Sequence, residues 1–444
     1  MATAVSFARS RRRAELSLGL LVVAVTVGGY ILVALANGPK LPPNVAVLLA
    51  WVFGLYLVAH IAVRKLAPAA DGTLLPLAAM LNGLGFVMIA RLAGGGKDYA
   101  QQARVQSLWV TIAIGVFIAT LFIVRDVRMF ARYRYLALLL GIFFMVLPLA
   151  PHIGQPKNGA RLWISVGPLS FEPSEIARVL LVAFFAAYLA DKREVLSEGR
   201  IRVGRWFLPS LRDLGPLLLA WGMALLVLAY EQDIGTSLLF FGVFAAMLYM
   251  TTRRSAYLVI TILLLVVGAV LAYKLFGRVQ LRVENWRNPW PNANGDAYQA
   301  VQGWYALGSG GIAGRGLGLG QPWLVPLAST DYMFTSIAEE LGLVGSIAII
   351  AAFMLFVGGA FRIAVDAVRP FTKLFAAGLA TIVGLQSFLI IGGATRVIPL
   401  TGISLPFVSY GGSSLVANFA VLAILLRISD DSVRTKVPPG ARAT

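Results

Sequence analysis

The chain has 444 residues, of which 59% are hydrophobic and 13% are charged, and its mean hydropathy is +0.80. These values exclude a soluble domain of this length, because so little of the chain can face water. The chain has no cysteine and only two histidines, His60 and His152. This excludes disulfides, thiolate metal sites and a multi-histidine metal site.

The formal net charge of +18 indicates anionic lipid headgroups as partners, and not nucleic acid. Basic residues fall mostly in short loops between apolar runs, as the positive-inside rule requires of membrane proteins. The first apolar run follows the basic stretch 9–13 and is too long to be the apolar region of a cleavable signal peptide.

Apolar runs of membrane-spanning length recur along the chain and predict an all-α polytopic membrane protein with about twelve transmembrane helices. The runs lie at about 15–35, 45–63, 74–92, 106–124, 133–150, 175–190, 214–230, 234–250, 256–275, 336–361, 372–393 and 409–427.

Basic loops alternate with base-poor loops, which predicts an even number of spans and both termini in the cytoplasm. The segments 151–173 and 276–335 then lie outside the cytoplasm, and both are longer than a connection needs. Between Lys274 and Asp331 there are five bases and three acids, so we expect an anionic ligand on that side. The second segment also mixes aromatic residues with glycine, which is typical of a chain lying at the membrane surface.

These patterns divide the chain into parts. We expect a cytoplasmic N-terminus with two helices over 1–70 and a membrane core over 71–428, which includes the large extracytoplasmic loop 276–335. The segment 429–444 contains a Pro-Pro-Gly sequence and is expected to be a disordered cytoplasmic tail.

Asp331 is the strongest candidate for chemistry. It ends the large loop, and an apolar run follows at once, where a carboxylate is costly unless it has a use. Partial desolvation would raise the pKa of its side chain toward the range of a general base. The alternative is that Asp331 only caps the next helix.

A glycine-dense stretch, 308–320, contains Arg315. Its backbone N–H groups could cradle a phosphate, with Arg315 assisting, or the stretch could be a flexible turn. It lacks the strand before and the helix after that a nucleotide-binding fold requires.

A second polar stretch covers 154–178. Glu175 and Arg178 are three residues apart at an expected helix start, so they can pair on one face, either as a structural ion pair or at a binding site. Lys157 and Arg161 could bind phosphate.

Two further polar stretches adjoin expected helices. The tight turn 231–236, which contains Gln232 and Asp233, is either a binding element or a simple polar turn. The stretch 402–414, which contains Ser409 and Tyr410, is rich in small residues that permit close helix packing or close approach of a ligand.

Together these stretches resemble the SEDS family, the RodA/FtsW/SpoVE glycosyltransferases that polymerise peptidoglycan strands. The resemblance covers about 75–430 and rests on several motifs in the family's order. They lie at 158–163, 172–178, 232–236, 298–299 with 308–311, 330–334 with 339–342, and 406–414.

The chain departs from the family pattern at several positions. Arg178 stands where the family commonly has Lys, and residues 329–332 read Ser-Thr-Asp-Tyr where it usually has His-Thr-Asp-Phe. Ile390 and Arg396 replace an Asn and a Gly that often precede Pro399. The family core has ten spans, so the first two spans of this chain are an addition.

The resemblance implies that Asp331 is the essential aspartate, which deprotonates the sugar 4-hydroxyl of lipid II. That oxygen then attacks the anomeric carbon of a strand linked to undecaprenyl pyrophosphate, which leaves. A divalent cation, Mg²⁺ or Mn²⁺, could assist the leaving group. The substrate-binding residues expected from the motifs are Lys157, Arg161, Trp163, Glu175, Arg178, Gln232, Asp233, Arg315, Glu339, Ser409 and Tyr410.

The resemblance also implies a class B penicillin-binding protein as partner, in an elongation or a division complex of the bacterial cell membrane. Short tails favour the elongation role, as in an actinobacterial member of the family. The competing class is a lipid II flippase, which would need a polar cavity reaching the cytoplasmic side. An O-antigen-ligase-like enzyme would share the donor chemistry but not these motifs.

Overall fold

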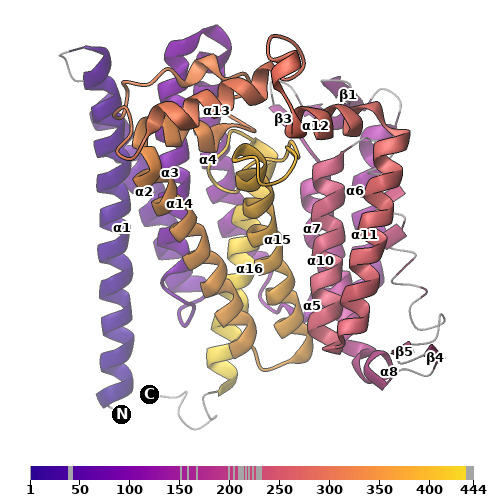
Figure 1. Ribbon diagram of the computed structural model, residues 1–444. Helices are drawn as coiled ribbons and strands as arrows, with labels where there is room; N and C mark the ends of the chain where they lie inside the picture. Colours follow the sequence, from indigo (N-terminus) through magenta and orange to yellow (C-terminus); the bar gives the residue numbers. More distant parts are fainter. Residues whose placement is uncertain are drawn as a thin grey trace.

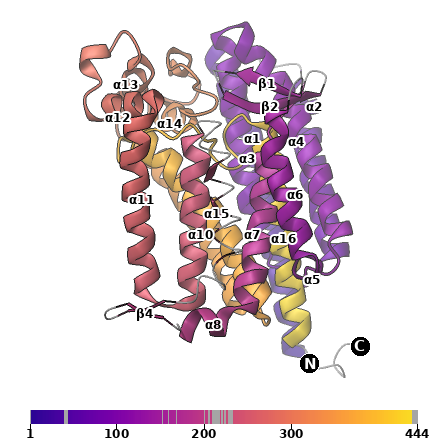
Figure 2. The same cartoon turned by 90° about the vertical axis from the view of Figure 1, so that its right-hand side faces the viewer.

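The structure is a computed structural model. It describes residues 2–38, 44–150, 153–157, 160–166, 169–198, 201–203, 206–208, isolated positions between 215 and 226, and 233–436. Its helices stand side by side in one bundle, with the N-terminus and the C-terminus at the same end (Figures 1 and 2). The long helices of the bundle are α1 (Ala2–Asn37), α2 (Val45–Leu66), α3 (Leu74–Leu92), α4 (Lys97–Ile123), α6 (Arg134–Val146), α7 (Ser174–Asp191), α10 (Ile234–Thr252), α11 (Ser255–Leu275), α14 (Met333–Asp366), α15 (Pro370–Ala394) and α16 (Gly412–Lys436).

In the described part of the chain, nine helices are long and apolar enough to cross a membrane: α1–α4, α10, α11 and α14–α16. Helix α6 is shorter, and the 18 residues of α7 include the charged residues Glu175, Arg178 and Asp191. Most of the run predicted at 214–230 lies outside the described residues. The class of all-α multi-pass membrane protein is therefore confirmed, and the number of twelve spans stays a prediction.

The end of the bundle opposite the termini carries the two segments that were predicted as long loops (Figure 1). Both have more structure than the sequence indicated. The strand over 160–166 pairs with an antiparallel strand on each side, with Gln155 opposite Trp163 and Ile164 opposite Phe171. The elements at this end are η1 (Ala93–Gly95), η2 (Leu147–Leu149), β1 (Gly154–Lys157), β2 (Ala160–Val166), β3 (Leu169–Phe171), α12 (Gly277–Arg287), η3 (Trp290–Asn292), α13 (Tyr298–Gly310) and η4 (Pro322–Leu324).

The end that holds the termini carries short elements and the last turns of α16 (Figure 2). The tail predicted from 429 begins too early, because α16 continues to Lys436. Asp430 is only 2% exposed, where it pairs with Arg434 at 2.9 Å and accepts a hydrogen bond from the Ala69 N–H at 2.8 Å. These contacts hold the last helical turns against the core. The short elements are α5 (Arg128–Arg132), α8 (Arg193–Glu198), β4 (Ile201–Val203) and β5 (Trp206–Leu208).

One apolar core runs through α3, α4, α7, α10 and α14–α16. Close packing of these side chains stabilises the bundle. Inside a membrane this gain comes from van der Waals contacts, because the side chains would otherwise face lipid and not water. Helix α11 differs, because only 11% of its apolar stretch is buried, and a row of exposed side chains such as Leu263 and Leu271 covers it. This is the surface expected of a helix that faces lipid.

The first two helices are joined to each other and to the core by a buried carboxylate. Glu15 of α1 is 1% exposed and contacts His60 Nδ1 at 2.9 Å and the Arg64 guanidinium, both on α2. A Cβ on Gly72, in the turn before α3, would lie 2.9 Å from Glu15 Oε2, so this turn packs directly on the carboxylate. The pairing explains how a charged residue is tolerated inside this bundle.

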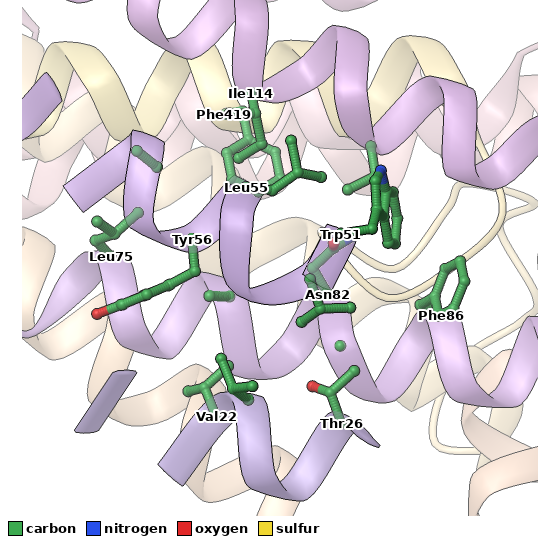
Figure 3. Close-up of a pocket in the computed structure, with 16 residues that line it drawn as sticks. Val22, Thr26, Trp51, Leu55, Tyr56, Leu75, Asn82, Phe86, Ile114 and Phe419 are labelled. Atoms are coloured by element: carbon green, nitrogen blue, oxygen red, sulfur yellow. The ribbon is translucent and has the colours of Figure 1, made fainter. Parts of the chain in front are cut away.

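A small cavity of about 60 Å³ lies between α1, α2, α3 and α4 (Figure 3). Side chains from both the N-terminal helices and the core line it, among them Thr26, Trp51 and Asn82. None of its 16 lining residues is charged. The cavity therefore differs from the charged clusters of the protein in having a mainly apolar, uncharged lining.

Candidate active site

Asp331 ends the large loop, two residues before α14. The helix begins at the end of the bundle opposite the termini (Figure 1). Its side chain is partly exposed. Burial raises the pKa of Asp331 to about 6, while the positive charge of Arg282 and a hydrogen bond from the Thr330 side chain act in the opposite direction. A carboxylate with this pKa can accept a proton near neutral pH and is basic enough for general-base work.

The alternative role of Asp331 as a helix cap is not what the structure shows. Tyr332 occupies the cap position of α14, and no side chain makes a capping hydrogen bond there. Asp331 therefore does not cap α14, which was the alternative role considered from the sequence.

The loop that carries Asp331 is held by the segment between α15 and α16. Ser409 Oγ donates to the Thr330 carbonyl at 2.7 Å and accepts from the Leu405 N–H at 3.0 Å. The Tyr410 N–H donates to the Ser329 carbonyl at 2.7 Å. The predicted residues Ser409 and Tyr410 therefore lie beside the catalytic candidate, where they fix its backbone.

Arg282 of α12 provides the positive charge near Asp331. Its Nη1 donates to the Thr401 carbonyl at 2.8 Å, and it lies over Gly402, where a Cβ would approach Nη2 to 3.1 Å. Gly402 has a φ of +78°, a conformation that suits glycine. Glycine at this position lets the arginine approach the backbone closely.

A second cluster lies at the start of α7. Glu175 and Arg178 form the ion pair that their spacing predicted, and their side chains are 7% and 6% exposed. Arg178 Nη1 also donates to Gln386 Oε1 of α15 at 3.1 Å, and Gln386 Nε2 donates to the Ser404 carbonyl at 2.8 Å. A buried pair with all these partners is costly to disturb.

Asp233 and Glu172 add two carboxylates to this cluster. Asp233 caps α10 by accepting a hydrogen bond from the Thr236 N–H at 3.0 Å. The pKa of Glu172 is raised to about 7, mainly by burial and also by the negative charge of Asp233, while the Ser174 hydroxyl and the Arg178 charge act in the opposite direction. Glu172 therefore titrates in the same range as Asp331.

The two clusters are joined through the chain between α15 and α16. Ser409 contacts the Asp331 loop, Ser404 accepts from Gln386, and Ser413 Oγ accepts from the Glu172 N–H at 2.8 Å. Because these serines lie within ten residues of one another, the segment 404–413 sets the position of one cluster relative to the other.

The glycine-dense stretch forms a third polar group, fastened to α14. Five of its N–H groups, those of residues 314, 315, 316, 318 and 319, donate to acceptors within the protein. They are not free to bind a phosphate. Arg315 remains the candidate contact, because its side chain is 46% exposed and lies 3.6 Å from Glu339, its one ion-pair partner among the described residues.

The anchor of this stretch is a buried ion pair that the sequence did not indicate. Glu340 accepts from Arg91 Nε at 2.9 Å and from the Gly318 N–H at 2.9 Å, and Arg91 Nη2 donates to the Gly320 carbonyl at 2.8 Å. Arg91 also lies 4.7 Å from the centroid of the Trp323 ring. The pair ties α3, the loop and α14 together.

Several predicted residues cannot be placed in these clusters. Gln232 and the side chains of Lys157 and Arg161 lie outside the described residues. Trp163 lies on β2, partly buried, opposite Gln155. Their binding roles stay predictions.

Besides Arg91 and Glu340, sequence reasoning missed three residues that the structure brings to the Asp331 and Glu175 clusters, namely Arg282, Gln386 and Glu172. A signal for each was present. Arg282 is a base on the side expected to be poor in bases, Gln386 is an amide inside an apolar run, and Glu172 is an acid just before a helix.

Within the described residues, no group of three or more His, Cys, Asp or Glu side chains gathers in a way that could hold a metal ion. The described side chains therefore do not fit a divalent cation held by the protein alone.

Comparison with known proteins defines the class. Residues 72–434 match the model of the FtsW/RodA/SpoVE family, described as a cell cycle protein. This match covers most of the chain and begins in the turn between α2 and α3. The chain belongs to the FtsW/RodA/SpoVE family.

Among its relatives, the peptidoglycan glycosyltransferase RodA of Mycobacterium tuberculosis is 39% identical over 430 residues, which is 96% of this chain and 92% of that protein. RodA of Mycobacterium leprae is 41% identical over 382 residues, or 85% and 81%. Stage V sporulation protein E of Bacillus subtilis is 31% identical over 375 residues, or 82% and 98%.

Solved structures agree on the fold. A chain from a peptidoglycan synthase complex that coordinates polymerization and crosslinking has a TM-score of 0.65 and 25% identity. The match covers 82% of this chain and 98% of that one. The rod shape determining protein RodA of Thermus thermophilus has a TM-score of 0.56 and 23% identity, over 82% and 97%.

Proposed function

We propose that Asp331 is the general base of glycan-strand polymerisation in this protein. The chain is a peptidoglycan glycosyltransferase, as are its relatives at 39–41% identity over most of their length. The observation that supports Asp331 is its setting: a partly exposed carboxylate at the end of the large loop, with a pKa of about 6 and no capping role.

In the reaction, the 4-hydroxyl of the lipid II sugar loses its proton to the Asp331 carboxylate. Its oxygen forms a bond to the anomeric carbon of the lipid-linked strand. The bond from that carbon to the pyrophosphate oxygen breaks, and undecaprenyl pyrophosphate leaves with the electron pair. Positive charge near the phosphates stabilises the charge that develops there.

Arg315 is the described residue best suited to contact the pyrophosphate. It is exposed and lies beside the loop, and its interaction with Glu339 is loose at 3.6 Å. Lys157 and Arg161, on the strands of the small sheet, are proposed to assist it. Trp163, Glu175, Arg178, Gln232, Asp233 and Glu339 are proposed to shape the rest of the substrate site.

The partner we propose is a class B penicillin-binding protein, which would crosslink the strands that this chain makes. The likeness to a chain from a peptidoglycan synthase complex supports a partner of this kind. The relatives named RodA favour a role in elongation over division.

We place both termini in the cytoplasm, because basic residues cluster at their end of the bundle.

A lipid II flippase is not favoured, because the relatives are named glycosyltransferases and the polar clusters that hold Asp331 gather at one end of the bundle. The test is incubation of the purified protein in liposomes with labelled lipid II, alone and with its partner. A glycosyltransferase makes a ladder of polymeric strands. Movement of lipid II between leaflets without any polymer would support the flippase and refute this function.

A further inference from the structure

Arg396 lies just after the end of α15 that faces the large loop. Arg396 follows the cap residue Thr395 and has a left-handed φ of +65°. The Val397 N–H donates to the Gly392 carbonyl at 2.8 Å and the Arg396 N–H to the Gly393 carbonyl at 3.3 Å. This is the Schellman helix ending, in which glycine normally occupies the position of Arg396.

An arginine in this conformation is strained, and strained residues that persist tend to have a function. Glycine would end the helix equally well without strain. The reason for an arginine must therefore lie in what its side chain contacts.

The side chain of Arg396 joins three elements. Its Nε donates to the Trp286 carbonyl at 3.1 Å and its Nη2 to the Arg287 carbonyl at 2.8 Å, which satisfies the last carbonyls of α12. Trp286 Nε1 returns a hydrogen bond to the Arg396 carbonyl at 3.0 Å. The guanidinium also lies 4.7 Å from the centroid of the Trp304 ring of α13.

Helix α12 depends on such contacts, because it has no core of its own. All eleven of its residues are described, and none is buried. Arg282 also attaches α12 to the chain after α15, because it donates to the Thr401 carbonyl. Arg282 and Trp286 are four residues apart, so they lie on one face of α12, and both contact the chain that follows α15.

We propose that Arg396 is a positioning residue for catalysis. It holds α12 and α13 over the end of α15, so that Arg282 stays against Thr401 and beside Asp331. This proposal rests on the proposed function, because it assigns to Arg396 the task of orienting the surroundings of the base. Arg396 itself does not touch the reacting atoms.

The effect on Asp331 has a definite sign. Among the described charged groups, Arg282 is the one whose charge lowers the pKa of Asp331, and the neighbouring Tyr332 stays neutral because burial raises its pKa. If α12 moves away, the pKa of Asp331 rises. The base is then protonated over a wider range, so activity is lost at a higher pH.

The decisive variant is Arg396→Gly, which removes the side chain and relieves the backbone strain. We expect the melting temperature to be retained and polymerisation to fall about 10- to 100-fold, as small misplacements near reacting groups do. The acid limb of the rate against pH should move to higher pH. The variant Arg396→Lys keeps the charge but not the paired donors, so it should rescue poorly.

The matched control is Arg287→Ala. It removes one positive charge from the same loop but leaves the Arg287 carbonyl that accepts from Arg396. It should keep the native rate and the native pH profile. Equal losses in Arg287→Ala and Arg396→Gly would show that loop charge matters and would overturn the positioning role.

A second readout does not depend on activity. The chain has no cysteine, so spin labels can be placed at Glu284 of α12 and Lys97 of α4, both exposed. Arg396→Gly should broaden the distribution of distances between them. An unchanged distribution and an unchanged pH profile would overturn the proposal. Loss of activity in Asp331→Asn would leave the proposed function standing in that case, so the two failures are distinguishable.

Discussion

At the scale of single residues, the site depends on how Asp331 is surrounded. Its carboxylate is crowded enough for burial to raise its pKa to about 6, and Arg282 keeps the pKa from rising further. A base must be deprotonated to act, so activity should fall as the pH drops through this value.

This predicts a polymerisation rate with an acid limb near pH 6, measured as initial rates from about pH 5 to about pH 8. Glu172, with a pKa of about 7, is the competing source of such a limb. The variant Glu172→Gln separates the two. The limb near pH 6 should persist in it, and its disappearance would assign the titration to Glu172.

The ion pair of Glu175 and Arg178 gives a prediction about stability. Glu175→Ala leaves the Arg178 charge buried and without this partner, which should lower the free energy of unfolding by about 3–5 kcal/mol. The control on the same helix is Asp191→Ala, because Asp191 and its partner Arg134 are 54% and 27% exposed. That change should cost at most about 1 kcal/mol. If a denaturant titration gave equal losses of unfolding free energy for Glu175→Ala and Asp191→Ala, the buried pair would stabilise the protein no more than the exposed pair.

At the scale of elements, the glycine-dense loop and α14 act as one unit. Helix α14 is kinked at Gly342, which has a φ of +65°, and the backbone of the glycine-dense loop packs against the kink. A Cβ on Gly342 would lie 2.2 Å from the Gly314 nitrogen. The buried pair of Arg91 and Glu340 holds the same junction from α3.

We therefore expect Gly342→Ala to lower the melting temperature and to impair polymerisation, since the strained backbone alone costs about 1–3 kcal/mol. Gly358→Ala is the matched control. Gly358 lies on the same helix with nothing within 4 Å of its Cβ position, so alanine there should stabilise the helix by about 0.5–1 kcal/mol. A silent Gly342→Ala would show that the kink is dispensable.

At the scale of the whole molecule, the predicted apolar runs agree with the helices wherever the chain is described. Length and hydropathy suffice for this, because a membrane span needs a long apolar stretch and internal hydrogen bonds. The ion pair of Glu175 and Arg178 was also predicted from their spacing and is present, whereas the catalytic role of Asp331 stays a prediction.

Other features could not be predicted from sequence. The sheet at 154–171 consists of short strands, and α12 is a short, mostly polar helix with no buried residue. The contact between Arg282 and Thr401 joins residues 119 positions apart, and no local pattern indicates such a contact. The last helix was predicted to end too early for the same reason. Asp430 accepts a hydrogen bond from the Ala69 N–H, which is distant in sequence, and no local pattern indicates that contact.

The arrangement of the bundle predicts its sidedness. The chain has no native cysteine, so Asn294→Cys in the large loop and Val368→Cys between α14 and α15 report cleanly. An impermeant thiol reagent added to intact cells should label Asn294→Cys and not Val368→Cys. Labelling of Val368→Cys should require permeabilised cells. Labelling in the reverse order would overturn the topology.

We propose that this protein polymerises lipid II with Asp331 as its base. The most direct test is the polymerisation rate of the purified Asp331→Asn variant, folded and bound to its class B penicillin-binding protein. Asparagine keeps the shape but cannot take the proton, so we predict a rate about 10²–10⁴-fold below the native one, with lipid II still bound. A folded Asp331→Asn variant that polymerises lipid II at nearly the native rate would contradict the account.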